Sequence, residues 1–110
     1  MKSKKKKQIN DIIENFNFEK VEKIMTLLAW AWQKSPSGIP SIKELKTRSK
    51  QMLKDVYERA EANSDSLMCC GTWVSRTGGF RAQATTCGDG NIVLSLSFEV
   101  AEWNNAKSNM

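Results

Sequence analysis

The stretch FRAQATTCGDGNIVLSLSF, residues 80–98, decides the fold. Apolar residues occupy alternate positions in both of its halves, and this period of two is typical of strands with one buried face. Gly88-Asp89-Gly90 separates the halves and favours a tight hairpin. We therefore expect two antiparallel strands, over residues 80–87 and 92–100. The residues predicted to face inward are Phe80, Ala82, Ala84, Ile92, Leu94, Leu96, Phe98 and Val100.

One more strand and two helices are predicted before this hairpin. Residues 67–75 form the strand, and Arg76-Thr77-Gly78-Gly79 is the turn that follows it. Asn17 is a good N-cap for a helix over residues 18–32. Ser41 and Glu44 have the spacing of a capping box and open a second helix, which ends at residues 63–66. Apolar residues recur at steps of three and four in both helices, as expected for helices with one buried face.

These elements predict an α+β fold of the order ααβββ. Short connections make the three strands an antiparallel meander, and the two helices are expected to cover its apolar face. The opposite face is expected to be polar, with Arg81, Gln83 and Thr85 beside Ser95, Ser97 and Glu99. A three-stranded sheet leaves two edges open, so pairing of edges in a homodimer is an expectation.

The net charge of +5 is concentrated at the N-terminus. Lys2 and Lys4 to Lys7 supply five of the 17 basic residues, and the remaining 12 match the 12 acidic residues. The pattern predicts a basic flexible tail over residues 1–9 and a single domain over residues 10–110. Lys4, Lys5, Lys6 and Lys7 are either solvated or contact a polyanion, because clustered lysines gain from counterion release.

The composition argues against an enzyme. The chain has no histidine, which removes Ser-His and Cys-His mechanisms and His-metal sites. Cys69, Cys70 and Cys87 are interpreted as buried thiols, so neither a metal site nor a cofactor is expected. No apolar run approaches the length of about 20 residues that spans a bilayer, so no membrane association is expected.

Two groups of residues are candidates for binding. The first group combines two arginines and a hydroxyl with glycines that let the backbone approach an anion, although an ordinary glycine hairpin has the same composition. Its members are Arg76, Thr77, Gly78, Gly79 and Arg81. Trp30 lies off the main apolar stripe of its helix and Trp103 follows the last strand, so both are candidates for an exposed interface residue, whereas a core position is the alternative.

Several phrases of the sequence together resemble a known group of proteins. They are FNFEKV at 16–21 and the helix that follows it, IPSI at 39–42, TGGFRA at 77–82, and residues 94–103. The chain resembles small accessory proteins of tailed bacteriophages and prophages, over most of residues 16–104. The resemblance carries no catalytic motif. It implies a protein of the bacterial host cytoplasm, where many phage accessory proteins inhibit host defence by binding.

Three functions are therefore expected. The first is a non-enzymatic inhibitor that binds a macromolecular target of a bacterial defence system, such as a host defence protein, in the manner of an anti-CRISPR protein. The second is a protein that sequesters a defence-signalling nucleotide, with Arg76 and Arg81 around its phosphates. The third is weak, non-specific nucleic-acid binding through the lysine tail.

Overall fold

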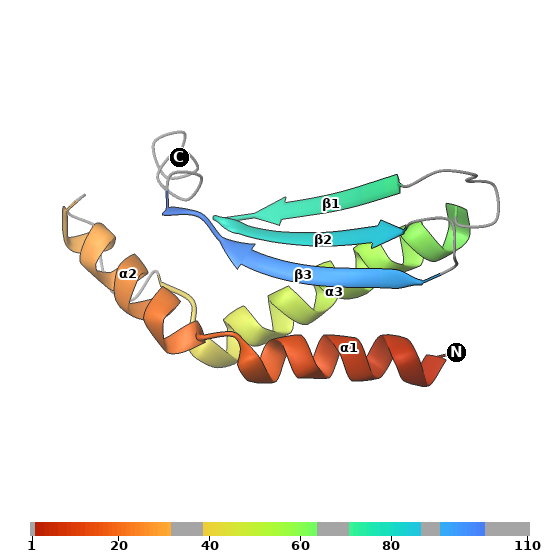
Figure 1. The fold of residues 1–110 in the computed structure, drawn as a ribbon. Coiled ribbons are helices and arrows are strands. Elements are labelled where there is room, and N and C mark those ends of the chain that lie inside the picture. Colours follow the sequence, from red (N-terminus) through yellow and green to blue (C-terminus); the bar gives the residue numbers. More distant parts are fainter. Residues whose placement is uncertain (1, 32–38, 64–70, 87–90, 101–110) are drawn as a thin grey trace.

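The sheet is the three-stranded antiparallel meander that the alternating stretch predicts. The computed structural model describes residues 2–31, 39–63, 71–86 and 91–100, and the side chains of these residues other than 2–4 and 29–31. β1 (Gly71–Thr77), β2 (Phe80–Thr86) and β3 (Ile92–Phe98) pair in the order β1-β2-β3 (Figure 1). Ala84 of β2 lies opposite Trp73 of β1 and Leu94 of β3, and the residues of β2 and β3 predicted to face inward are buried or half-buried. The prediction is wrong for Val100, which lies beyond the end of β3 and is exposed.

Three helices precede the sheet, one more than the sequence pattern predicts. They are α1 (Lys2–Asn15), α2 (Phe18–Ala31) and α3 (Ile42–Asn63). The two predicted N-caps are confirmed. The Asn17 Oδ1 atom accepts a hydrogen bond from the Lys20 N–H group at 3.0 Å, and Ser41 Oγ accepts one from the Glu44 N–H group at 3.2 Å. These side chains satisfy backbone donors that the first turn of a helix leaves unpaired.

The prediction of a flexible tail over residues 1–9 is wrong for residues 2–9, which belong to α1. Ile9 and Ile13 lie one helical turn apart and are buried, and Ile12 and Phe16 pack partly against the same core. The lysines precede this apolar stripe and continue the same helix. Burial of the isoleucines therefore holds the N-terminal helix on the domain, despite its high charge.

The helices do not share the inner face of the sheet as predicted. α3 lies across all three strands, and α1 lies beside α3 and along β3 (Figure 1). α2 contacts α3 and extends away from the sheet, which it meets at its first residue, where the rings of Phe18 and Phe80 are 6.1 Å apart. The predicted layering therefore holds for α3, and α1 takes the place expected for α2.

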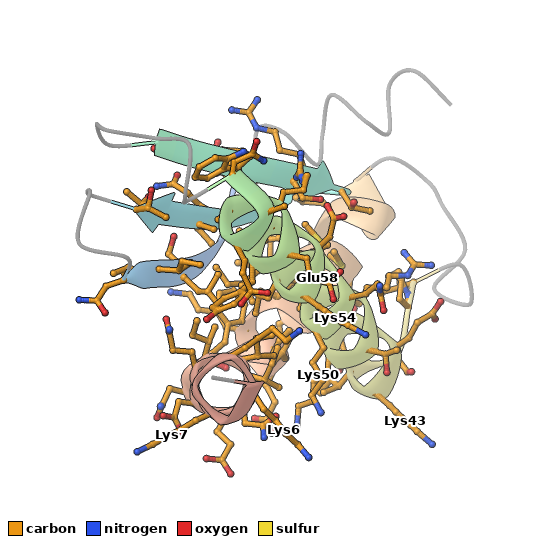
Figure 2. The ribbon with its side chains drawn as sticks, turned by 90° about the vertical axis from the view of Figure 1, so that its right-hand side faces the viewer. Lys6, Lys7, Lys43, Lys50, Lys54 and Glu58 are labelled. Atoms are coloured by element: carbon orange, nitrogen blue, oxygen red, sulfur yellow. The ribbon has the colours of Figure 1, made fainter. Side chains whose placement is uncertain are left out.

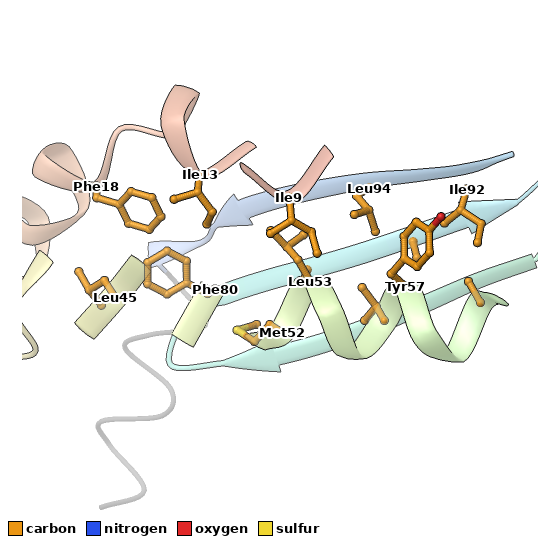
Figure 3. Packing of buried hydrophobic residues seen from close by; sticks show 14 of the residues in the cluster. Ile9, Ile13, Phe18, Leu45, Met52, Leu53, Tyr57, Phe80, Ile92 and Leu94 are labelled. Carbon is orange, nitrogen blue, oxygen red and sulfur yellow. The ribbon is translucent and has the colours of Figure 1, made fainter. Parts of the chain in front are cut away.

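One hydrophobic core lies between the helices and the sheet. Figure 3 shows Ile9 and Ile13 of α1 pointing toward the same space as Leu53 and Tyr57 of α3. Ser49 is fully buried in this core, and its hydroxyl has no hydrogen-bond partner. Every buried hydrophobic residue that the structure describes belongs to the cluster: Ile9, Ile13, Phe18, Val21, Met25, Leu45, Met52, Leu53, Val56, Tyr57, Ala60, Phe80, Ala82, Ala84, Ile92 and Leu94.

Side chains occupy backbone groups on both edges of the sheet. On β3, the Gln8 side chain donates from Nε2 to the Ile92 carbonyl at 2.9 Å and accepts from the Leu94 N–H group at 3.1 Å. On β1, Arg59 Nη2 donates to the Val74 carbonyl at 3.0 Å. Unpaired edges invite another strand, so these contacts protect the sheet. Pairing of β1 with a second copy stays a prediction.

The face of the sheet that points away from the helices is called the outer face here. None of the described helices lies on this outer face. Among the described residues, no helix is long and apolar enough to cross a membrane. Strand alternation and the register assign the residues of the outer face. They are Thr72, Val74 and Arg76 of β1, Arg81, Gln83 and Thr85 of β2, and Val93, Ser95 and Ser97 of β3.

Candidate functional site

The carboxylates of α3 are largely neutralised by ion pairs. Glu44 pairs with Arg48 at 2.8 Å, and Asp55 pairs with Arg59 at 3.2 Å, both four residues apart on the helix. Glu58 pairs with Lys5 of α1 at 3.5 Å. The two pairs within α3 are exposed and contribute little to stability. The consequence of all three pairs is electrostatic, because these carboxylates are already paired and none of the described ion pairs includes a lysine of α3.

Lys43, Lys50 and Lys54 recur at steps of seven and four on α3, which places them on one side of the helix. All three are exposed, and none forms an ion pair within the described part of the chain. Figure 2 shows them on the same side of the molecule as Lys6 of α1. We call these four residues the lysine surface. From Lys43 to Lys54 it extends about 16 Å along the helix axis.

The lysine run at the N-terminus divides into different roles. Lys5 is half-buried: it pairs with Glu58, and its ammonium group lies 5.9 Å from the centre of the Tyr57 ring. Lys6 and Lys7 are exposed, and Lys7 points away from α3 (Figure 2). Lys4 lies in α1, but its side chain is outside the described part. Of the predicted polyanion contacts, Lys6 is therefore the residue that joins the lysine surface.

The glycine turn is narrower than predicted. Gly78 and Gly79 alone connect β1 to β2, with φ angles of 55° and 96°. Two positive φ angles in a two-residue loop are the geometry of a type I′ turn, which glycine adopts without strain. The Gly79 carbonyl accepts a hydrogen bond from the Glu99 N–H group at 2.8 Å. The conformation of the turn thus explains both glycines.

The register places Arg76 directly opposite Arg81, on the outer face of the sheet. Neither guanidinium forms an ion pair with a carboxylate in the described part of the chain, and the Arg81 Nε atom is buried without a hydrogen-bond partner. Glu99 follows β3 near this turn and is exposed. Of the predicted anion site, the structure therefore brings the two arginines together on adjacent strands, next to the glycine turn.

A shallow groove lies between α3 and β1, on the side of the sheet that the helices cover. Its volume is about 440 Å³. The carboxylate and guanidinium in its lining, Asp55 and Arg48, are both already paired with α3 residues. No cluster of three metal-ligating residues occurs among the residues described. The groove lining comprises Arg48, Gln51, Met52, Asp55, Ser75 and Thr77.

Some predicted site residues cannot be placed. Trp103 and the three cysteines lie outside the described residues. Trp30 belongs to α2, but its side chain is not described.

Sequence reasoning missed Gln8 and the three α3 lysines of the lysine surface. The lysine spacing is visible in the sequence, but its meaning depends on which carboxylates are already paired. Comparisons of the chain with protein-family models, with curated proteins and with solved structures gave no match.

Proposed function

We propose that this protein works by binding rather than by catalysis, and that the lysine surface binds the phosphate backbone of a nucleic acid. The supporting observation is the separation of charge on α3. Glu44 and Asp55 pair with the arginines of α3 and Glu58 pairs with Lys5, whereas none of the ion pairs in the described part of the chain includes the three α3 residues of the lysine surface. Like charges on neighbouring turns repel one another, and a polyanion relieves that repulsion while it releases its own counterions.

The surroundings of the lysine surface favour phosphates over a protein partner. Specific protein interfaces have an apolar centre. The large hydrophobic residues that the described chain exposes lie elsewhere: Leu27 on α2, Val93 on the outer face, and Val100 after β3. A surface that offers charge without an apolar centre suits a ligand that is recognised through its charge.

The proposed binding has a measurable salt dependence. For duplex DNA the slope of log K against log salt is about −0.9 for each neutralised phosphate, and for a single strand about −0.7. Four lysines therefore give a slope of about −3.6 on a duplex. The experiment is a titration of a labelled 20-base-pair duplex, chosen at roughly two helical turns, followed by fluorescence anisotropy at several salt concentrations.

Matched variants locate the surface. Lys50→Gln combined with Lys54→Gln is expected to reduce the magnitude of the slope by about 1.8, since two phosphate contacts are lost. The control is Lys20→Gln combined with Lys23→Gln, which removes two exposed lysines from α2. Absence of salt-dependent binding in the unaltered protein contradicts the proposal. An equal loss in the α2 control and in the Lys50, Lys54 double variant shows that net charge, not this surface, is responsible.

The role as an inhibitor of bacterial host defence stays a prediction from the resemblance. The lysine surface adds one condition to it, because a target bound through this surface has to present phosphate groups.

A further inference from the structure

The arginine pair at the turn carries an inference that is independent of the lysine surface. Arg76 and Arg81 are neighbours on adjacent strands, next to the residues that flank the type I′ turn. In a two-residue hairpin the flanking residues form a hydrogen-bonded pair, so the next pair is the closer, non-hydrogen-bonded kind. The Cα atoms of such a pair are about 4.5 Å apart and both side chains lie on the same face.

The residues that border this pair within the three strands are uncharged. Ser97 lies opposite Arg81 on β3, and Val74 lies opposite Gln83 on the next rung of the ladder. The Gln83 amide already donates a hydrogen bond to Thr85 Oγ1 at 3.2 Å. Glu99 directly follows β3, where its N–H group donates to the Gly79 carbonyl, and its carboxylate forms no ion pair with either arginine.

Two unfavourable interactions therefore occur at this pair of arginines. Like charges directly opposite each other destabilise an antiparallel pair. A guanidinium N–H group that is shielded from water, such as Arg81 Nε, also costs free energy when it has no acceptor. An oxyanion placed between the two arginines reduces both costs, because it supplies negative charge and acceptor atoms at once.

The geometry of the donors selects the kind of anion. Each guanidinium presents a planar fork of N–H groups that matches two oxygens of one acceptor group. A carboxylate has two oxygens and fills one fork. A phosphate group has at least one more oxygen, so it can accept from both arginines. We propose that Arg76 and Arg81 bind a phosphate group on the outer face, with the exposed Ser97 hydroxyl beside it.

Phosphate chemistry has two sources, a free nucleotide and a nucleic-acid strand, and the experiment separates them. The probes are inorganic phosphate, adenosine monophosphate and a single-stranded thymidine oligonucleotide. Binding is followed by NMR on the full chain, through the Nε–H resonances of both arginines and the backbone amides of Gly78 and Gly79. We expect saturable shifts with inorganic phosphate. A larger affinity gain for the mononucleotide indicates a free nucleotide, and a larger gain for the oligonucleotide indicates a strand.

The variants test the arginines directly. Arg76→Gln and Arg81→Lys are each expected to weaken phosphate binding at least about tenfold, because each removes one fork of charge-assisted hydrogen bonds. Lys23→Gln, with the same change in charge as Arg76→Gln, is the control and is expected to leave phosphate binding unchanged, because Lys23 is an exposed residue of α2 and belongs to neither proposed site. Lys50→Gln separates the two proposals, since it weakens nucleic-acid binding at the lysine surface and leaves the arginine pair intact.

A thermal measurement keeps the test decisive if a variant changes the fold. Arg76→Gln is expected to unfold at a slightly higher temperature than the unaltered protein in phosphate-free buffer, because the repulsion between the arginines is gone. It is also expected to lose the stabilisation that phosphate gives. Absence of saturable shifts at the arginines, or equal phosphate affinity in Arg76→Gln, overturns the proposal.

Discussion

Replacing Gln8 with alanine tests whether α1 is held on the edge of the sheet. The Gln8 side chain makes two partly buried hydrogen bonds to β3, with the Ile92 carbonyl at 2.9 Å and the Leu94 N–H group at 3.1 Å. Each bond of this kind contributes about 0.5–1.5 kcal/mol net, so the two together contribute about 2 kcal/mol. Alanine returns a few tenths of a kcal/mol through its higher helix propensity. We expect Gln8→Ala to lower the free energy of unfolding by about 1.5 kcal/mol.

Urea unfolding followed by circular dichroism measures this change. With a denaturant slope of about 1.5 kcal/mol/M, the unfolding midpoint falls by about 1 M. Amide hydrogen exchange supplies a local readout, because the Leu94 N–H group loses its acceptor and exchanges faster. The control is Asn10→Ala, an exposed position of the same helix. An unchanged midpoint together with unchanged Leu94 exchange in Gln8→Ala would refute the docking of α1 on β3.

Three further changes have expected outcomes. Ser49→Ala removes a fully buried hydroxyl without a hydrogen-bond partner, so we expect about 1 kcal/mol of added stability and a rise of roughly 4 °C in Tm. Calorimetry measures the change, with Thr47→Ala at an exposed position as the control, and a loss of stability in Ser49→Ala contradicts the prediction. Gly78 has a φ of 55°, and nothing lies within 4 Å of an added Cβ atom, so Gly78→Ala is expected to lower the free energy of unfolding in urea by about 1 kcal/mol through backbone strain alone. Asparagine tolerates this φ, so Gly78→Asn is expected to cost much less, and equal losses in the two variants show that the turn conformation is not the cause. Burial, and then the charge of Glu61, raise the pKa of Tyr57 above 10.0. The neutral phenol thus favours the folded state below the unfolded-state pKa, and this contribution to stability is lost as the pH rises through the folded-state pKa. Tyr57→Phe is therefore expected to lose less stability than the unaltered protein above pH 10 in alkaline unfolding curves, and parallel curves for the two proteins argue against this.

The sheet was predictable because its pattern is local. Residues 80–98 alternate with a period of two, and the structure has β2 at Phe80–Thr86 and β3 at Ile92–Phe98 within the predicted spans. The two N-caps were predictable for the same reason, since Asn17 and Ser41 act within three residues along the chain. Local hydrogen bonding and alternation need no knowledge of the rest of the fold.

The helix at the N-terminus was not predictable from local pattern. Its first residues are mostly lysine, and the isoleucines that anchor it begin at Ile9. The contact that positions it joins Gln8 to Ile92, 84 residues away. The lysine surface was not predictable for the same reason, since it also depends on contacts between distant parts of the chain. The spacing of Lys43, Lys50 and Lys54 is present in the sequence, but their lack of partners follows from ion pairs that the fold arranges.

The contact between the first helix and the last strand also sets an order of events during synthesis. The residues of α1 leave the ribosome before those of the sheet, and Ile92, which receives the Gln8 hydrogen bond, is made 84 residues after Gln8. At about 5–20 residues per second, that interval lasts roughly 4 to 17 seconds. During this time the buried side of α1 has no sheet to cover, and its neighbouring lysines keep the nascent segment soluble by mutual repulsion. The lysines of α1 can therefore serve the emerging chain before they serve the finished domain.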